Sequence, residues 1–160
     1  MKRVAIFVDV QNIYYTTRQA YAANFDYNAF WRQATAQRIV AKATAFAIER
    51  GDEKQRQFQN VLRGIGFEVK LKPYISRADG TSKGDWDVGI TIDVLDSAAH
   101  CDVVVLASGD GDFDVLVQHL RQRFSIDVEV YGVPKLTAGT LMSAATRFVP
   151  IDSALLLQAK

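Results

Sequence analysis

Val103–Phe113 reads VVVLASGDGDF, and this stretch decides the fold that we predict. Its first half, 103–107, is a short and wholly apolar run, which is typical of a strand buried on both faces in a parallel sheet. Gly109 and Gly111 end that strand. Beyond them, apolar residues recur across 113–120 at the i, i+3, i+4 and i+7 spacing of a helix with one apolar face. The stretch therefore predicts a strand, an acidic turn and a helix.

The acidic turn places Asp110 and Asp112 at the carboxyl end of a central strand, which is where open α/β sheets bind their ligands. Two carboxylates in so short a turn repel each other unless a positive charge lies between them, and a divalent metal ion would supply it. A second apolar run, 3–9, also ends in a carboxylate, that of Asp9, and Asn12 follows about one helical turn later. The sequence thus predicts a metal site at one edge of a sheet, with hard oxygen ligands that favour Mg²⁺ or Mn²⁺.

The rest of the chain alternates between strand-like and helix-like segments. Residues 38–49 are ambiguous, because alanine favours a helix whereas the larger residues alternate as in a strand, and we interpret the segment as a strand. Further strands are expected at 67–73, 126–132 and 148–151, and helices after Asp9, after a cap at Asp26 or Asn28, across 58–65, at 85–99 and at 136–145. This succession implies an α/β fold with a mostly parallel sheet covered on both faces.

Length and composition set further bounds. With 160 residues, 49% of them hydrophobic, the chain suits one well-buried domain spanning 1–160. Because 19 basic residues nearly cancel 18 acidic ones, nucleic-acid binding would need local clusters of charge. Cys101 is the single cysteine, which excludes an intramolecular disulfide and agrees with a reducing cytoplasm. We find neither a signal-peptide pattern nor a segment long enough to span a membrane, and so expect a soluble cytoplasmic protein.

A third acidic position begins the helix expected at 85–99. Asp87 follows a loop-like segment, 74–85, and is the better placed ligand on this helix. Asp93 lies six residues further on, which is roughly 240° around a helix, so the two acids cannot both point at one ion. We therefore expect Asp93 to orient a neighbouring ligand. Taken alone, any one of these acids is more often an ordinary helix cap than a metal ligand, and it is the group of acids that indicates a metal site.

A basic stretch interleaved with aromatic residues leads into Asp87. It consists of Lys70, Lys72, Tyr74, Arg77, Lys83 and Trp86. Such a stretch can grip phosphates and stack bases, although a solvated strand edge and loop would have the same composition. Other motifs are absent: the acidic turn lacks the glycine and the final glutamate of a calcium loop, no glycine-rich nucleotide motif occurs, and the two histidines do not have zinc-ligand spacing.

Three motifs in order resemble the NYN domain family. They are FVDVQN at 7–12, KGDWD at 83–87 with Asp93, and SGDGDF at 108–113. More closely, the chain resembles the LabA/DUF88 branch of the PIN-like nuclease superfamily, from residue 3 to about residue 151. This resemblance implies a PIN-like three-layer α/β/α sandwich with a central, mostly parallel sheet and a metal-dependent ribonuclease site.

The resemblance also implies roles for individual residues. The family's acidic positions correspond to Asp9, Asp87, Asp110 and Asp112, and its polar positions to Asn12 and Ser108. Asp114 is an additional acid, which we expect to support the ligands, and Thr146 stands where an aspartate is common.

The leading hypothesis is hydrolysis of RNA phosphodiester bonds by a metal-activated water, in which Asp9, Asp110 and Asp112 hold one or two Mg²⁺ or Mn²⁺ ions with help from Asp87. Asn12 and Ser108 would orient the water, a ligand or a phosphate oxygen, and Lys83 would neutralise the phosphate or the cluster of acids. Two alternatives remain: a LabA-like regulatory or RNA- or protein-binding module with little turnover, and a nuclease that acts on DNA. The oligomeric state stays open, with a homodimer as one alternative.

Overall fold

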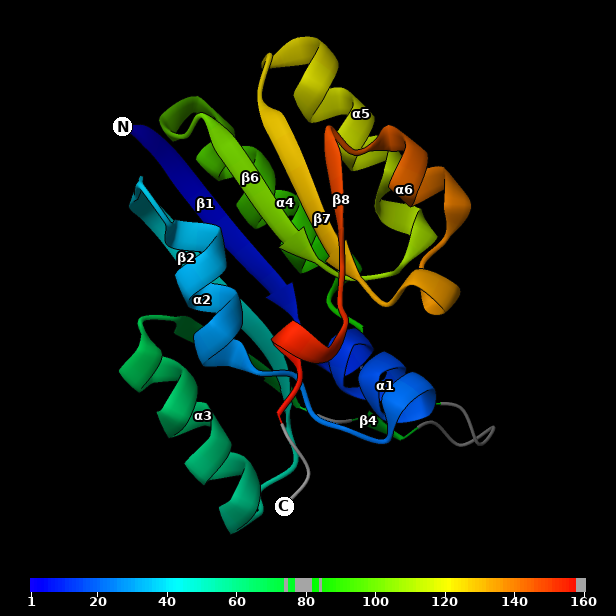
Figure 1. The fold of residues 1–160 in the computed structure, drawn as a ribbon. Helices are drawn as coiled ribbons and strands as arrows, with labels where there is room; N and C mark the ends of the chain where they lie inside the picture. The colour runs from blue at the N-terminus through cyan, green and yellow to red at the C-terminus, as the bar shows by residue number, and fades with distance from the viewer. Residues whose placement is uncertain (74, 77–81, 84, 158–160) are drawn as a thin grey trace.

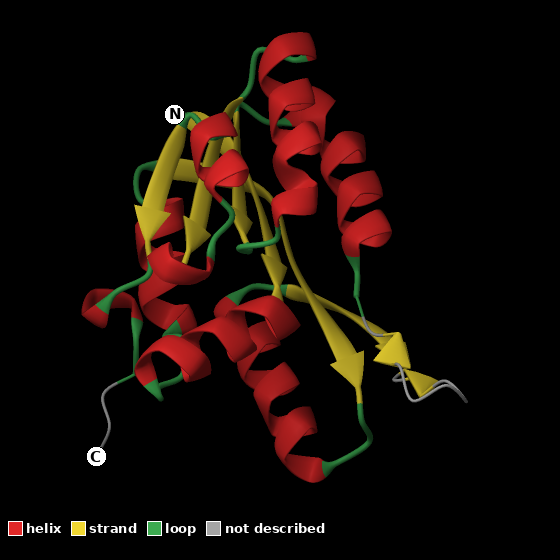
Figure 2. Ribbon diagram, turned by 90° about the vertical axis from the view of Figure 1, so that its right-hand side faces the viewer, coloured by secondary structure: helices red, strands yellow, loops and turns green. Residues whose placement is uncertain are grey.

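The protein forms a parallel sheet with helices packed on both of its faces (Figure 1, Figure 2). The structure is a computed structural model that describes residues 1–73, 75, 76, 82, 83 and 85–157. The main sheet has six parallel strands in the order β3 (Glu68–Pro73), β2 (Arg38–Glu49), β1 (Lys2–Asp9), β6 (Val103–Ala107), β7 (Asp127–Gly132) and β8 (Arg147–Pro150). The predicted α/β fold is confirmed.

Two apolar cores lie on opposite faces of this sheet. The helices over the first core are α1 (Val10–Tyr21), α2 (Tyr27–Thr35) and α3 (Glu53–Ile65). The helices over the second are α4 (Asp87–Ser97), α5 (Asp114–Arg123) and α6 (Gly139–Ala144). Successive strand side chains alternate between the cores, as Ile6 and Phe7 of β1 do. The molecule therefore has the three-layer α/β/α arrangement that the resemblance implied.

The segment 38–49, which we predicted as a strand, is β2, the longest strand of the sheet. Its alanines at 43, 45 and 47 face the core under α1, α2 and α3, while Phe46 faces the opposite core. β1 and β3 pair with β2 on its two sides, so its buried backbone groups are hydrogen-bonded across the sheet. Small side chains on one face of a buried strand thus produced the helix-like composition.

All six strands are parallel, but the direction in which the chain adds strands to the sheet reverses between β1 and β6. The chain passes from β1 to β2 on one side and returns later to form β6 on the other side. Val8 pairs with Ala107 across these two strands, so the next residues along each chain, Asp9 and Ser108, emerge side by side. In open α/β sheets such a switch leaves a crevice at the carboxyl ends of the strands, where ligands bind.

Several helices are shorter than the sequence predicted. The helix expected at 85–99 begins at Asp87 and gives way to a 3₁₀ turn after Ser97. The helix expected at 136–145 is a 3₁₀ turn, Pro134–Leu136, followed by the short α6. The loop expected at 74–85 contains two short antiparallel strands, β4 (Ile75–Ser76) and β5 (Ser82–Lys83).

None of the described helices has both the length and the apolar character needed to cross a lipid bilayer.

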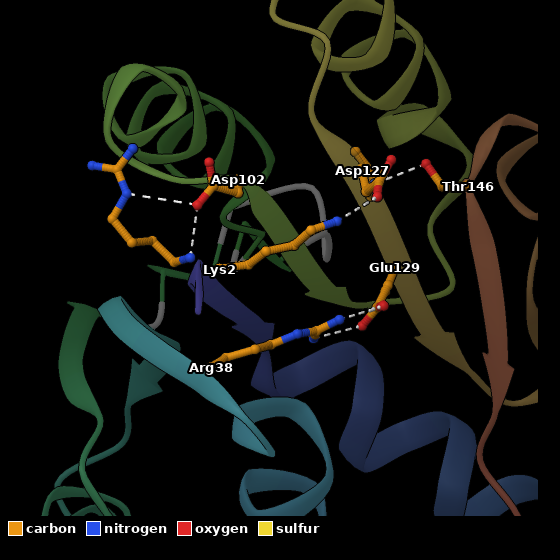
Figure 3. A network of polar contacts seen from close by, with 8 residues as sticks. Lys2, Arg38, Asp102, Asp127, Glu129 and Thr146 are labelled. Atoms are coloured by element: carbon orange, nitrogen blue, oxygen red, sulfur yellow. Dashed lines mark hydrogen bonds and ion pairs between the residues drawn. The ribbon is translucent and has the colours of Figure 1, made fainter.

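At the amino ends of the strands, polar contacts join segments that are distant in sequence (Figure 3). Arg38 makes two hydrogen bonds to the Glu129 carboxylate, at 2.9 and 2.8 Å, and reaches it across β1 and β6. Only 20% of the Arg38 side chain and 11% of the Glu129 side chain are exposed. Lys2 lies 3.8 Å from Asp127, but both side chains of that pair are mostly in solvent. The Arg38–Glu129 pair is therefore the stronger of these ties between β2 and β7.

Candidate metal centre

The Asp9 carboxylate ends β1 and caps α1. Its Oδ1 accepts a hydrogen bond from the backbone N–H of Asn12 at 3.5 Å, and its Oδ2 accepts one from the Ser108 hydroxyl at 3.1 Å. The residue is only 7% exposed. A strand end, a helix start and the neighbouring strand end thus hold this carboxylate in one orientation, at the place that the sequence predicted.

The turn after β6 holds the second group of acids. Its backbone is fixed by the Gly109 N–H, which donates to the Asn12 side-chain oxygen at 2.8 Å, and by the Asp112 N–H, which donates to the Asp110 carboxylate at 2.9 Å. Gly109 has no room for a side chain, because an added Cβ would lie 2.7 Å from the Leu136 carbonyl oxygen. The backbone of the turn is therefore packed against the segment that precedes α6.

Asp87 reaches the same place from α4. The preceding residue, Trp86, anchors the start of that helix, since its indole N–H donates to the Ala47 carbonyl at 2.8 Å and its ring packs against Phe46. Gly89 makes room for the indole, because a Cβ at Gly89 would lie 2.5 Å from it. Trp86 therefore positions Asp87 and is half-buried, rather than standing free to stack on a base.

Three of the four predicted acids form a compact cluster. Asp87, Asp110 and Asp112 each offer one carboxylate oxygen, and these oxygens lie within 4.8 Å of one another. Asp9 is not part of that triplet, but the charge of Asp110 raises the pKa of Asp9, and the charge of Asp9 raises the pKa of Asp87. We call the triplet the acidic cluster. It joins Asp87 to Asp110 and Asp112, which follow it by 23 and 25 positions in the sequence, and only the fold brings them together.

The pKa values of two carboxyl groups record this crowding. Burial raises the pKa of Asp9 to about 6; the charges of Asp110 and Asp85 add to the rise, while the hydrogen bonds from Asn12 and Ser108 oppose it. The pKa of Asp87 is raised to about 7, first by burial and then by its hydrogen bond to Asp110 and the charge of that residue. Near neutral pH the Asp87 carboxyl group is therefore partly protonated, because neighbouring carboxylates repel each other when all of them are ionised.

The residues present fit a divalent cation. Among the described residues, no Lys or Arg forms an ion pair with Asp9 or with any acid of the acidic cluster. Carboxylate oxygens are the ligands that Mg²⁺ and Mn²⁺ prefer, and a bound cation would relieve the repulsion that raises these pKa values. The acidic cluster therefore offers the kind of oxygen ligands that a divalent cation needs.

Of the other predicted site residues, Asn12 and Ser108 bind Asp9 or the acidic turn, whereas Lys70, Lys72, Asp93 and Asp114 lie outside the acidic cluster. The ammonium group of Lys70 lies 2.5 Å from the Asp93 carboxylate. Asp93 therefore pairs with Lys70, and Asp87 is the residue of α4 that belongs to the acidic cluster. Lys72 donates to the Asp85 carbonyl at 2.9 Å and lies over the Trp86 ring. Asp114 begins α5 and is not in the triplet.

Two predicted residues cannot be placed. Arg77 lies outside the described residues, and for Lys83 the description covers only the backbone, in β5. Two other groups were not predicted at all. Asp85 acts on the pKa of both Asp9 and Asp87, and the buried Tyr27 lies within reach of the Asp9 charge. Asp85 stood in the KGDWD motif and could have been found there, whereas nothing in the sequence linked Tyr27 to the site.

Comparisons with known proteins agree with this architecture. The crystal structure of VPA0982 from Vibrio parahaemolyticus superposes with a TM-score of 0.93; the two are 57% identical, over 98% of this chain and 96% of that one. The low amplitude and bright protein LabA of Synechococcus elongatus is 26% identical over 160 residues, 94% of this chain and 84% of LabA.

A more distant likeness concerns the fold alone. Ribokinase from Giardia lamblia has a TM-score of 0.51 at 14% identity, over 93% of this chain and 57% of the kinase.

At family level the match is specific, since the model of the NYN domain matches residues 3–152. That span contains all three motifs on which the resemblance was based. The chain therefore belongs to the NYN domain family.

Proposed function

We propose that this protein is a divalent-metal-dependent ribonuclease that hydrolyses RNA phosphodiester bonds. The observation that carries the proposal is the acidic cluster: three carboxylate oxygens from two separate elements lie within 4.8 Å of one another, with no basic partner among the described residues. Membership of the NYN domain family supports the same activity, because the resemblance of its motifs is to metal-dependent nucleases of the PIN-like superfamily. RNA as the substrate class follows from that resemblance.

In this proposal Asp87, Asp110 and Asp112 hold Mg²⁺ or Mn²⁺, and Asp9 adds negative charge beside them. When bound, the metal ion lowers the pKa of a coordinated water and offsets charge on the attacked phosphate. Asp87 has a raised pKa, and its carboxyl group is hydrogen-bonded to Asp110. A cation held at the acidic cluster would favour the ionised form of this carboxyl group, so metal binding near neutral pH would release a proton from Asp87.

Asn12 and Ser108 have positioning roles in this proposal. Ser108 donates its hydroxyl hydrogen to Asp9 and accepts the backbone N–H of Asp110, so one side chain spaces two acids. Asn12 fixes the turn through Gly109. These bonds hold the carboxylates close together against their repulsion. Removing either side chain should therefore weaken metal binding more than it weakens contact with RNA.

A second candidate function is a regulatory or binding module with little turnover. The pairing of Lys70 with Asp93 favours it, because a lysine engaged in an ion pair is less available to a phosphate. Lys72 likewise lies against Trp86 and Asp85. Similarity to LabA over most of the chain is compatible with either function. Both candidates keep a metal site, so cleavage itself must decide between them.

The deciding experiment incubates pure protein with end-labelled single-stranded RNA and with DNA of the same sequence, in Mn²⁺, in Mg²⁺ or in chelator. Asp112→Asn removes one exposed acid of the cluster, and Asp96→Asn is the matched control, since Asp96 is exposed on α4 and outside the cluster. We expect Asp112→Asn to lower the rate of RNA cleavage by about a hundredfold or more, equivalent to about 3 kcal/mol, and Asp96→Asn to leave it unchanged.

Two outcomes would count against the proposal. If the parent protein and Asp112→Asn cut equally well, the activity does not come from this site. If the parent shows no metal-dependent cleavage of RNA, while metal still binds, the module function is the correct one. Faster cleavage of DNA than of RNA would keep the metal mechanism and change the substrate.

A further inference from the structure

A cavity of about 700 Å³ lies on the other side of α1 from the acidic turn. It is bounded by α1, by the carboxyl end of β2 and by the first turns of α3. Asn24, Phe25 and Leu157 also line it. Figure 1 shows α1 and α3 at the end of the molecule toward which β1 and β6 point. Pockets of about 300–1,000 Å³ are the usual size for small ligands and parts of larger ones.

Aromatic side chains dominate the wall of this cavity. Phe25, Tyr27 and Phe58 form its inner part, and their rings meet edge to face, with centroids 5.0 and 5.5 Å from that of Tyr27. At the mouth stand Tyr14 and Tyr15, whose ring centroids are 5.5 Å apart. Both of these tyrosines are 52% exposed. Two large half-exposed rings beside an apolar cavity are typical of a surface that binds a flat ligand.

The charged residues at the cavity are all basic. Its lining contains Arg50 and Lys54 and no carboxylate among the described residues. The Arg50 guanidinium donates to the Tyr15 hydroxyl at 3.5 Å, and its backbone N–H donates to Gln55 at 2.6 Å. Gln55 in turn donates to the Ile48 carbonyl at 2.6 Å, so α1, α3, the end of β2 and the residue after it are joined by hydrogen bonds at the cavity. The cavity therefore suits a ligand that is flat and anionic at one end.

Helix α1 connects the cavity to the acidic cluster. Asp9 caps this helix, and Val10, Ile13 and Tyr14, which share one helical face, line the cavity. Asn12 lies on another face and binds the acidic turn through Gly109. Tyr27, in the cavity wall, has a pKa that burial raises and that the charge of Asp9 raises further. The two sites thus share a helix and are within electrostatic reach of each other.

We propose that the cavity receives an unpaired base of the RNA strand whose backbone passes the acidic cluster. The rings of Tyr14 and Tyr15 are nearly perpendicular, at 76°, so one of them stacks on the base while the other packs against its partner ring edge to face. Arg50 and Lys54 contact the adjoining phosphates. The occupant is single-stranded RNA, because a base held in a duplex is not free to enter a cavity of this kind. This inference rests on the proposed function and gives it a preference for unpaired RNA next to the cleaved bond.

The test measures binding separately from cleavage. A fluorescent oligouridine is titrated with protein in chelator, where metal-dependent cleavage is absent, and its anisotropy is recorded. The probes are the free strand, the same strand paired with its complement, and a strand with abasic ribose positions. Tyr14→Ala and Tyr15→Ala are compared with Phe124→Ala. Phe124 is the matched control, because it is an aromatic residue with 40% exposure and lies outside the cavity, at the end of α5.

We expect each tyrosine variant to weaken binding of the free strand by about tenfold, and Phe124→Ala to have no effect. Binding of the abasic strand should be equally weak in the parent and in the tyrosine variants. Thermal melting will show whether the variants are folded, which the exposure of both tyrosines leads us to expect. Thiouridine in the free strand should form photo-crosslinks to the peptide that contains Tyr14 and Tyr15.

The inference and the proposed function can fail independently. If the tyrosine variants bind and cleave RNA like the parent, the cavity has another ligand and the inference is wrong, although the ribonuclease proposal stands. If the parent binds RNA through the tyrosines but never cleaves it, the base site stands and the catalytic proposal fails. Equal affinity for the duplex and the free strand would also overturn the inference.

Discussion

Metal binding by this protein should depend steeply on pH, because two of its carboxyl groups hold protons that a cation must displace. Asp9 has a pKa of about 6 and Asp87 a pKa of about 7. A carboxyl group binds a metal ion only in its ionised form, so the apparent affinity follows the ionised fraction of each group. The perturbation is a change from about pH 8 to about pH 5.5.

The expected magnitude follows from these two values. At about pH 8 both groups are about nine-tenths ionised or more; at about pH 5.5 Asp9 is about one quarter ionised and Asp87 about 3%. Loss of the Asp87 carboxylate alone lowers the affinity about thirtyfold, and loss of both lowers it about a hundredfold. We expect the hundredfold change, since the charge of Asp9 lies beside the cluster. Carboxyl groups with ordinary pKa values would remain ionised throughout.

The assay is calorimetric titration with Mn²⁺ at the two pH values, at constant ionic strength. Repeating it near pH 6.5 in buffers of different ionisation enthalpy measures the protons released, and we expect about one per metal ion. Asp9→Asn should reduce the pH dependence to about thirtyfold. A change of threefold or less between the two pH values would refute the reasoning, because Asp87 would then not be a ligand or would not hold a proton.

The same groups should have the opposite effect on stability when metal is absent. The folded-state pKa of Asp9 lies above its unfolded value of 3.8, so the folded protein favours the protonated form. The resulting stability is present below about pH 4 and is lost as pH rises through about 6. A shift of about two units corresponds to about 3 kcal/mol. In chelator, Asp9→Asn should therefore gain melting temperature relative to the parent as pH rises from 5 to 8.

Two further predictions concern the framework of the site. Gly109→Ala should lower the free energy of unfolding by about 1–3 kcal/mol and weaken Mn²⁺ binding, because the added Cβ would meet the Leu136 carbonyl. The control is Gly64→Ala, in open space on α3, which should stabilise the protein slightly when both variants are compared by thermal melting. Glu129→Gln should cost about 2 kcal/mol in urea denaturation, because it leaves Arg38 without its bidentate partner; a loss under about 0.5 kcal/mol, as expected for an exposed pair, would contradict this reasoning.

The sequence was sufficient to predict the sheet, and it indicated that carboxylates would gather at the carboxyl edge of that sheet. Buried parallel strands are nearly continuous apolar runs, so Val103–Ala107 and the run that ends at Asp9 were visible without a structure. Acids at the carboxyl ends of such strands meet at one edge once the strands are neighbours. Asp87 was found from its place at the start of a helix, and it lies in the acidic cluster.

The remaining features depend on registers that no local pattern encodes. Lys70 looked like a phosphate ligand, but the position of β3 relative to α4 puts it against Asp93. Trp86 looked like a stacking residue, but the end of β2 supplies the carbonyl that fixes its indole. The aromatic cavity combines α1, α2, β2 and α3, so its members are scattered along the sequence. Side-chain pairing between elements therefore had to come from the three-dimensional structure.

Asp9 connects these features, because its single side chain takes part in each of them. It caps α1, which carries the tyrosines of the cavity mouth, and it accepts the Ser108 hydroxyl, which also receives the Asp110 backbone N–H. Its buried charge raises the pKa of Asp87 in the acidic cluster and that of Tyr27 in the cavity wall. A metal ion in the cluster would lower the cost of that buried charge and so stabilise the same helix start against which a bound base would lie. Metal and RNA should therefore favour each other's binding through Asp9, even where their own contacts do not overlap.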